Sequence, residues 1–326
     1  MTILVTGAAG FIGFHLCQAL LGQGEKVLGV DSLNDYYDPA LKEGRLALLQ
    51  GRDNFAFVKL ELSDREDVMA VAEANPEVTR VVHLAAQAGV RYSLENPYAY
   101  VDANVMGQVV LMEAARRWEK LDHFVYASSS SVYGGNKKIP FAVGDPVENP
   151  VSLYAATKRS VELMSTTYAG LYGLPLTGLR FFTVYGPWGR PDMAYFSFTK
   201  DIFEGRQIRV FNHGDMRRDF TYIDDIVAGI QAVMKRPPVA TEGQVPHNIY
   251  NLGNHRSETL GHFIEVLEGA CGREAVKKYE PMQLGDVHET YADIDSSRRD
   301  FGFEPKISIE EGLPRFVDWY KGHYGV

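Results

Sequence analysis

Apolar runs of strand length alternate with segments of helical periodicity through the first half of this 326-residue chain. Short, unbroken runs of Val, Leu and Ile are typical of strands that are buried on both faces of a parallel sheet. The segments between them repeat apolar residues three and four positions apart, which is the spacing of one helix face. Because parallel strands need crossover helices, the pattern predicts an α/β fold with a doubly wound parallel sheet. The expected strands are Ile3–Val5, Lys26–Val30, Phe55–Leu60, Arg80–Leu84, Phe124–Ala127 and Pro175–Leu179, and the expected helices are Gly10–Leu21, Arg65–Ala74, Ala103–Trp118 and Ser152–Tyr172.

The alternation loosens after residue 180, where segments rich in Gly, Pro and Arg separate shorter helices. We therefore expect residues 1–180 to form a Rossmann-like domain. Residues 181–326 are expected to form a smaller α/β domain that is interleaved with the first and covers the carboxyl edge of its sheet. The shorter helices are expected at 197–204 and 260–270, and the stretches expected to return to the first domain lie at 218–230 and 248–252.

Composition and charge narrow the range of partners. The formal net charge is −9, the pI is near 5.5 and no long run of Lys and Arg occurs, so nucleic acid is not an expected partner. No apolar run approaches the ~20 residues that span a bilayer, and the first strand begins without a preceding leader. The two cysteines, Cys17 and Cys271, are expected to be free thiols of a reducing compartment. These features predict a cytoplasmic protein that binds no membrane.

A glycine motif, Gly7-Ala8-Ala9-Gly10-Phe11-Ile12-Gly13, separates the first strand from the first helix. Glycine lets the backbone approach a pyrophosphate closely, and the helix N-terminus attracts anions, so the motif predicts a dinucleotide site. Asp31 ends the second strand 18 residues after Gly13. A carboxylate there accepts hydrogen bonds from ribose hydroxyls and repels a 2′-phosphate, which favours NAD over NADP. Glu61-Leu62 and Leu84-Ala85-Ala86, after the third and fourth strands, are further candidates for this site.

Tyr154 and Lys158 lie four residues apart in an expected helix, so their side chains share one face. A free phenol titrates near pH 10 and is a poor base at neutral pH. A nearby ammonium group and a nicotinamide cation both favour the phenolate and lower its pKa. Together with the glycine motif, the pair indicates hydride chemistry at a sugar or alcohol carbon.

Four serines, Ser128–Ser131, follow the fifth expected strand, at the edge where ligands bind in open α/β folds. Such a run also occurs in solvated turns, so at most two of the four are expected to face a substrate. No metal is predicted, because His213 and His288 lie in loops without further ligands at metal-binding spacing.

Longer motifs resemble a known family. The segments that carry the resemblance are TGAAGFIG (6–13), NDYYD (34–38), HLAAQAGVRY (83–92), SSSSVYG (128–134), YAATK (154–158), LRFFTVYGPWGRPDM (179–193) and NHGDMRRDFTYIDD (212–225). They are similar to the UDP-glucuronate 4-epimerases, which are extended short-chain dehydrogenases/reductases of the NAD-dependent epimerase/dehydratase family. The resemblance spans nearly the whole chain.

The resemblance implies a bound NAD that is regenerated in each turnover, and interconversion of UDP-glucuronate and UDP-galacturonate through a 4-keto intermediate. It assigns Tyr154 as the base, Lys158 as its modulator and ribose ligand, and Ser129, with Ser130 beside it, as the hydroxyl relay. It also suggests a homodimer formed through the helices at 103–118 and 152–172. The cofactor-binding residues expected on this basis are Gly7, Gly10, Phe11, Ile12, Gly13, Asp31, Asn34, Glu61, Leu62, Leu84, Ala85, Ala86, Asn104, Tyr154, Lys158 and Phe181.

The same resemblance places the substrate at Ser129, Ser130, Tyr154 and five further residues. Epimerases of neutral hexoses resemble one another in having Asn where this chain has Thr183, and a threonine leaves more space beside a carboxylate. Arg190 or Arg91 would supply the countercharge. Arg218 and Asp286 match positions that hold the uridine diphosphate and its ribose. Related hexose epimerases often have Arg at Gln283, and the missing phosphate contact is expected from Arg217 or Arg180.

Several alternatives to the epimerase remain open from the sequence. A UDP-glucuronate decarboxylase shares the first half of the chemistry, and a UDP-glucose 4-epimerase shares the fold. Dehydratases place Asp-Glu after the relay residue, whereas this chain has Ser130-Ser131 there. An NAD-binding regulator without turnover is the alternative from a different class, although a regulator needs no catalytic base such as Tyr154.

Overall fold

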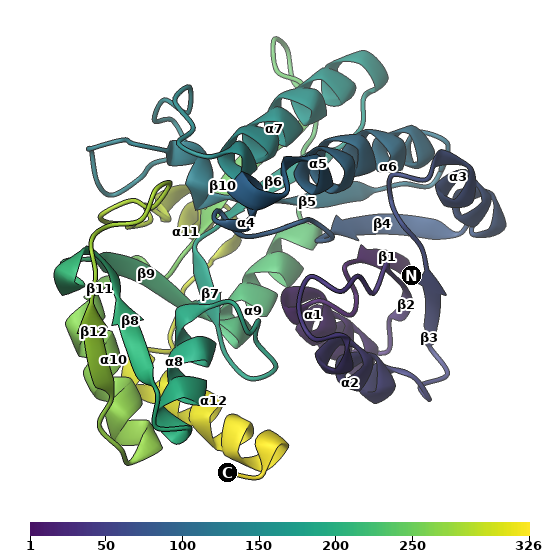
Figure 1. Cartoon of the computed structure of the whole chain (residues 1–326). Coiled ribbons are helices and arrows are strands. Elements are labelled where there is room, and N and C mark those ends of the chain that lie inside the picture. Colours follow the sequence, from purple (N-terminus) through teal and green to yellow (C-terminus); the bar gives the residue numbers. More distant parts are fainter.

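A seven-stranded parallel sheet forms the centre of the molecule, and the computed structural model describes all 326 residues (Figure 1). Its strand order is β10-β6-β5-β4-β1-β2-β3 and all its strands are parallel, so the sheet grows from β1 to β3 on one side of β1 and from β4 to β10 on the other. The doubly wound α/β fold predicted from the alternating pattern is therefore confirmed. The strands are β1 (Thr2–Thr6), β2 (Lys26–Asp31), β3 (Phe55–Lys59), β4 (Val78–His83), β5 (His123–Ser129), β6 (Leu176–Phe181) and β10 (His247–Leu252).

Helices cover both faces of this sheet (Figure 1). One layer consists of α1 (Phe11–Gly22), α2 (Pro39–Leu49) and α9 (Ile223–Met234), and the other of α3 (Arg65–Ala74), α6 (Gly107–Ala115) and α7 (Leu153–Tyr172). Helix α7 begins where the Ser152 hydroxyl accepts a hydrogen bond from the Ala155 amide, and it ends at Gly173 with φ of 68°. These caps fix the register in which Tyr154 and Lys158 are presented.

Three elements differ from the sequence prediction. Strand β5 extends to Ser129, so the strand itself positions the predicted relay serine. The helix expected over 103–118 begins as a π-helical turn, Val101–Met106, and continues as α6 to Ala115. Helix α2 was not predicted, although Asp38 caps it and Pro39 occupies its first turn, both of which are start signals.

A smaller part of the molecule lies over the carboxyl edge of the main sheet (Figure 1). It contains a three-stranded sheet, β11-β9-β7, and a two-stranded sheet, β12-β8. β9 belongs to the three-stranded sheet. The next helix, α9, contacts α1, and the strand after it, β10, joins the edge of the main sheet. The elements are β7 (Thr183–Tyr185), α8 (Ala194–Phe203), β8 (Gln207–Val210), β9 (Arg217–Tyr222), β11 (Ser257–Thr259), α10 (Leu260–Cys271), β12 (Val276–Tyr279), α11 (Asp295–Phe301) and α12 (Ile309–Tyr324), with the short helices α4 (Tyr92–Glu95) and α5 (Pro97–Tyr100) near the first part.

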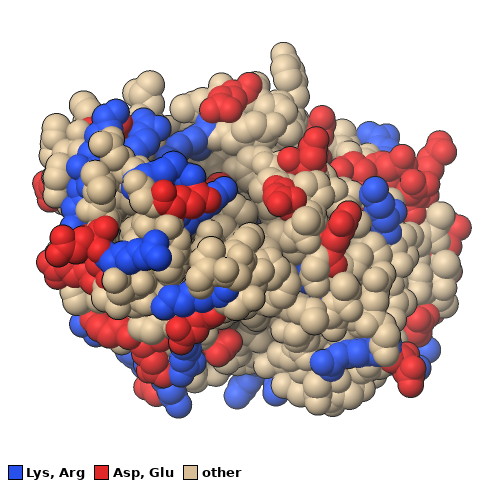
Figure 2. All heavy atoms as spheres, turned by 60° about the horizontal axis from the view of Figure 1, so that its bottom comes forward, with Lys and Arg blue, Asp and Glu red and all other residues tan.

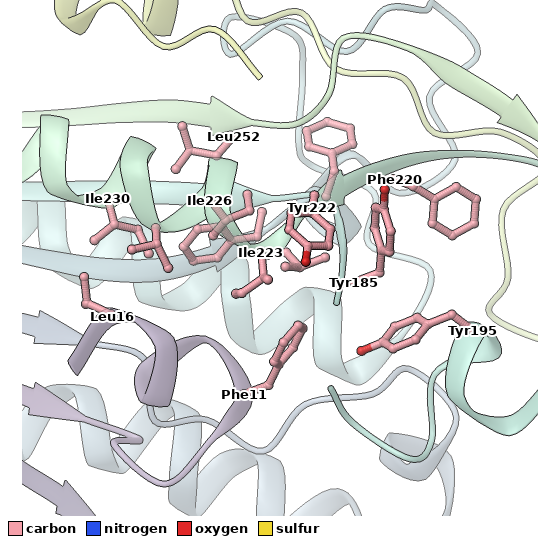
Figure 3. Close-up of a cluster of buried hydrophobic side chains, with 14 of the residues drawn as sticks. Phe11, Leu16, Tyr185, Tyr195, Phe220, Tyr222, Ile223, Ile226, Ile230 and Leu252 are labelled. Atoms are coloured by element: carbon pink, nitrogen blue, oxygen red, sulfur yellow. The ribbon is translucent and has the colours of Figure 1, made fainter. Parts of the chain in front are cut away.

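One hydrophobic core joins the two parts (Figure 3). Phe11 of α1 and Ile226 of α9 lie in the same buried cluster as Leu252 of the main sheet and Phe220 of the smaller one. Because this core is continuous, the two parts are held in a fixed relation, and a cavity between them keeps its shape.

Acidic and basic side chains lie next to one another on the face shown in Figure 2. Many are paired, as Arg209 is with Glu280 and Lys277 is with Glu268. Cys17 and Cys271 are both buried and free, as predicted. None of the helices has both the length and the apolar character required to cross a membrane.

Candidate active site

A cavity of about 830 Å³ runs along the carboxyl edge of the main sheet, and the smaller part of the molecule closes its far side. It is lined by residues as far apart in the fold as Asp31 of β2 and Arg218 of β9. Every predicted cofactor and substrate residue lines it, with the exception of Asn104. The structure thus brings the two motif groups, the glycine loop and the Tyr/Lys helix, into one site.

The glycine motif forms a tight turn in which the three glycine positions have no room for a side chain. Gly7 has φ of 71°, and a Cβ there would lie 2.8 Å from the Ala85 nitrogen. A Cβ on Gly13 would lie 2.0 Å from the Gly7 carbonyl oxygen, and one on Gly10 would lie 3.0 Å from it. The bare backbone at the start of α1 therefore fits a dinucleotide pyrophosphate.

Asp31 is held in place at the end of β2 and is 8% exposed. Its carboxylate accepts hydrogen bonds from the Ala9 amide at 3.1 Å and the Leu33 amide at 2.9 Å. Each oxygen retains a lone pair for a ribose hydroxyl. Lys42 of α2, which the sequence did not indicate, donates to the carbonyl and the side-chain oxygen of Asn34 at 2.7 and 2.6 Å. This contact fixes the segment that follows Asp31.

Tyr154 and Lys158 both reach the cavity from α7. Burial raises the pKa of Tyr154, whereas a hydrogen bond with Ser129 and the charge of Arg190 lower it. The Lys158 ammonium instead donates to the Ala127 carbonyl oxygen at 2.9 Å, and burial lowers its pKa to about 8. In this structure the lysine is anchored to the end of β5.

The first serine of the run is bound to a buried ion pair. Ser128 donates to Glu162 of α7 at 2.6 Å, and Glu162 also accepts two bonds from Arg180 at 2.7 and 2.8 Å. Both charged side chains are buried, with exposures of 0% and 2%. Ser129 and Ser130 lie outside this network, and all four serines line the cavity. Arg180, one of the two arginines expected to contact a phosphate, is therefore bound to Glu162 instead.

Glu162→Ala is expected to destabilise the fold, because it leaves the Arg180 guanidinium buried without a countercharge. Removing one partner of a buried pair typically costs about 3–5 kcal/mol. Denaturant unfolding should measure this loss. The control is Glu73→Ala, because Glu73 is 73% exposed in a 3.8 Å pair with Arg117 and should change stability by less than about 1 kcal/mol. Equal effects of the two variants would contradict the prediction.

Asn104, which was predicted to bind the cofactor, is buried and does not line the cavity. It lies in the π-helical turn, where its amide bonds to the backbone nitrogen and oxygen of Gln87 at 2.9 and 3.1 Å and to the Thr157 hydroxyl at 3.1 Å. It therefore fixes the loop after β4 against α7, one layer behind the site.

Arg190 lines the cavity and is paired with a residue two positions away. Its guanidinium donates to the Asp192 carboxylate at 3.0 and 2.5 Å. Burial acts to raise the pKa of Asp192, but the Arg190 charge lowers it below its usual value. The Tyr36 hydroxyl also donates to Asp192, at 3.3 Å. Tyr36 and Asp192 were not predicted as site residues.

A second cationic region lies beside β8 and β9. The Arg91 guanidinium lies 3.4 Å from Asp286, so these two predicted substrate residues contact each other. Arg91 and Arg209 each lie 4.8 Å from the ring centroid of Phe211, and all three line the cavity. Arg218 donates to the backbone oxygens of residues 217 and 288, and burial lowers its pKa.

Gln283 and Arg217 both lie outside the set of cavity-lining residues. Arg217 bonds to the Ser257 oxygen at 2.7 Å and to Glu289 at 3.3 Å, so neither Arg217 nor Arg180 is free for a phosphate. Arg209 is the additional cation in this part of the cavity. On β8 it alternates with the buried residues Ile208 and Val210, and the sequence analysis did not single it out.

Residues 3–253 match the model of the NAD dependent epimerase/dehydratase family. The chain is 48% identical over 337 residues to the probable UDP-glucuronate 4-epimerase of Rhizobium meliloti (strain 1021), a match that covers 99% of this chain and 98% of the relative. It is 50% identical over 336 residues to Protein CapI of Staphylococcus aureus, covering 99% of both. Its fold is similar to the crystal structure of UDP-glucuronic acid 4-epimerase from Bacillus cereus in complex with UDP-glucuronic acid and NAD. That match has a TM-score of 0.91 and 35% identity, and it covers 99% of this chain and 100% of the other.

Proposed function

Because the chain belongs to the NAD dependent epimerase/dehydratase family, we propose that it interconverts UDP-glucuronate and UDP-galacturonate by inverting C4 of the sugar. The resemblance found in its motifs is confirmed by the whole-chain matches to UDP-glucuronate 4-epimerases. The observation that carries the proposal is that Tyr154, Ser129 and Lys158 line one cavity together with Arg190.

The residues of this chain supply the acid, the base and the orientation. Tyr154 takes the proton of the 4-hydroxyl, directly or through Ser129. After the 4-keto sugar has turned over about its diphosphate linkage, Tyr154 returns a proton to the C4 oxygen as the ketone is reduced on its other face. The glycine loop and Asp31 would hold NAD, which accepts the C4 hydride and returns it to the opposite face when bound. Proton transfer of this kind typically contributes about 10²–10⁴ to the rate.

Arg190 distinguishes an epimerase of a uronate from one of a neutral sugar. The 4-keto uronate is a β-keto acid, and it loses CO₂ when its C5–carboxylate bond aligns with the carbonyl π system. We assign Arg190, Ser130 and Thr183 to hold the carboxylate out of that alignment. Arg218 is assigned to the diphosphate and Asp286 to the uridine ribose, since all of these residues line the cavity.

Separate incubation with UDP-glucuronate, UDP-glucose and UDP-xylose, followed by chromatography of the products, tests this function. UDP-galacturonate formed from UDP-glucuronate is the expected result. A UDP-pentose as the main product would identify a decarboxylase, turnover of UDP-glucose alone would identify a hexose epimerase, and no product from any sugar would favour a regulator.

The purified protein should carry NAD and need little or none added, because the cofactor is regenerated in place. Asp31 should exclude NADP by repulsion of its 2′-phosphate. Denaturing the protein and assaying the supernatant for NAD and NADP measures which nucleotide the purified protein carries. Release of no nucleotide together with activity restored by NADP alone would contradict both expectations.

We further propose that the protein acts as a cytoplasmic homodimer, with residues 1–180 as the NAD-binding domain and 181–326 as the interleaved UDP-sugar domain. Support for the dimer comes from apolar side chains that are exposed on neighbouring elements, namely Tyr98 of α5 at 78%, Val101 at 45% and Leu163 of α7 at 53%. Sedimentation of Leu163→Glu beside the unmodified protein tests it. A dimer that survives this change would place the interface elsewhere.

A further inference from the structure

Arg45 of α2 is fully buried and has no carboxylate partner. Its guanidinium donates at 3.0 and 2.7 Å to the carbonyl oxygen of Trp188 and at 3.0 Å to that of Gly189. It also donates at 3.0 Å to the carbonyl oxygen of Ala9 and at 2.6 Å to the Tyr37 hydroxyl. All five N–H groups of the guanidinium are thereby used. A buried charge without a countercharge is costly, so only this full set of oxygen acceptors makes it tolerable.

The acceptors of Arg45 belong to two segments with assigned roles. Ala9 lies in the glycine motif that would hold the pyrophosphate. Trp188 and Gly189 directly precede Arg190, which is assigned to the sugar carboxylate. These segments are almost 180 residues apart in the sequence, and one rigid, planar side chain joins them.

The loop that carries Arg190 is restrained on its other sides as well. His15 of α1 bonds to the Pro187 oxygen at 2.9 Å, and the Trp188 ring packs against Trp319 of α12 at 5.3 Å. Trp188 has φ of 58°, a left-handed conformation that needs such support. The Tyr195 hydroxyl, on the α8 side chain labelled in Figure 3, accepts the Arg190 amide at 3.2 Å. Of these contacts, only those of Arg45 reach the cofactor loop directly.

We propose that Arg45 is a positioning residue that sets the Arg190 loop relative to the NAD-binding loop, and so fixes the direction in which Arg190 holds the substrate carboxylate. This inference rests on the proposed role of Arg190. Lysine in place of Arg45 keeps the charge but presents three donors from one point, so it cannot bridge both segments.

The test compares Arg45→Lys with the unmodified protein in the affinity for UDP-glucuronate and for UDP, which lacks the sugar. We expect UDP-glucuronate to bind about tenfold more weakly and UDP to bind unchanged, with a UDP-pentose by-product from the freed carboxylate. In an Arg190→Ala background, Arg45→Lys should cause no further loss, because both changes remove the same interaction. Arg52→Lys, in the exposed loop after α2, is the matched control and should behave as the unmodified protein.

Equal loss of UDP and UDP-glucuronate affinity, or additive effects of the two arginine changes, would overturn the inference. If Arg190→Ala alone fails to weaken UDP-glucuronate selectively, it is the proposed role of Arg190 that fails. Should Arg45→Lys not fold, Tyr37→Phe removes one acceptor and leaves the guanidinium in place. It should weaken UDP-glucuronate relative to UDP in the same direction, and an unchanged ratio would refute the proposal.

Discussion

Tyr154→Phe should lower turnover of UDP-glucuronate by about 10³-fold or more, since it removes the only assigned group that can accept the C4 hydroxyl proton. The ring remains, so its packing against Tyr100 at a centroid distance of 6.0 Å is kept. UDP-sugar binding should stay within a few-fold of the original. Calorimetric binding measured beside turnover separates the two effects.

The Ser129 hydroxyl provides the matched comparison for this prediction. Ser129→Ala removes the hydrogen bond that lowers the pKa of Tyr154, so the remaining activity should shift its optimum to higher pH. Tyr154→Phe has no phenol to titrate and should show no such shift. If Tyr154→Phe kept the original rate, the base would have to lie elsewhere, with Ser130 and water as the next choice.

The parts of this molecule that were predicted correctly depend on local sequence. Buried parallel strands are short apolar runs, and the glycine motif and the Tyr/Lys spacing determine their own geometry. The predicted site residues therefore converge on one cavity, although Asn104 lies behind it. Nothing in a sequence separates a residue that lines a cavity from one that supports its wall, so the cofactor contact expected of Asn104 stays a prediction.

Contacts between distant segments were not predictable in the same way. The Arg91–Asp286 pair joins residues 195 positions apart, and each had been assigned to the substrate separately. Two acceptors of Arg45, the carbonyl oxygens of Trp188 and Gly189, lie 143 and 144 positions away, and the helix of Arg45 was itself missed. By contrast, the Arg190–Asp192 pair is local, and opposite charges two positions apart in a loop are a signal that a search for ion pairs could have used.

Arg190→Ala should change the product as well as the rate. In the structure this guanidinium is bound to Asp192 and lines the cavity, so a substrate carboxylate would share it with an acid that is already present. An arginine–carboxylate pair withdrawn from water gives direction as well as attraction, beyond the ~0–1 kcal/mol of an exposed pair. UDP-glucuronate should therefore bind at least about tenfold more weakly, and UDP-glucose should be little affected.

Without Arg190 the carboxylate is also free to rotate into line with the C4 carbonyl, so release of CO₂ should yield a UDP-pentose beside UDP-galacturonate. Product chromatography together with inhibition constants for both UDP-sugars measures these effects. Arg206→Ala, at an exposed arginine outside the cavity, is the control and should leave all of them unchanged. Equal weakening of both sugars without a pentose would mean that Arg190 holds the diphosphate or the loop. Arg91 lines the same cavity, and its guanidinium lies 3.4 Å from Asp286. It would then be the residue to test for the carboxylate.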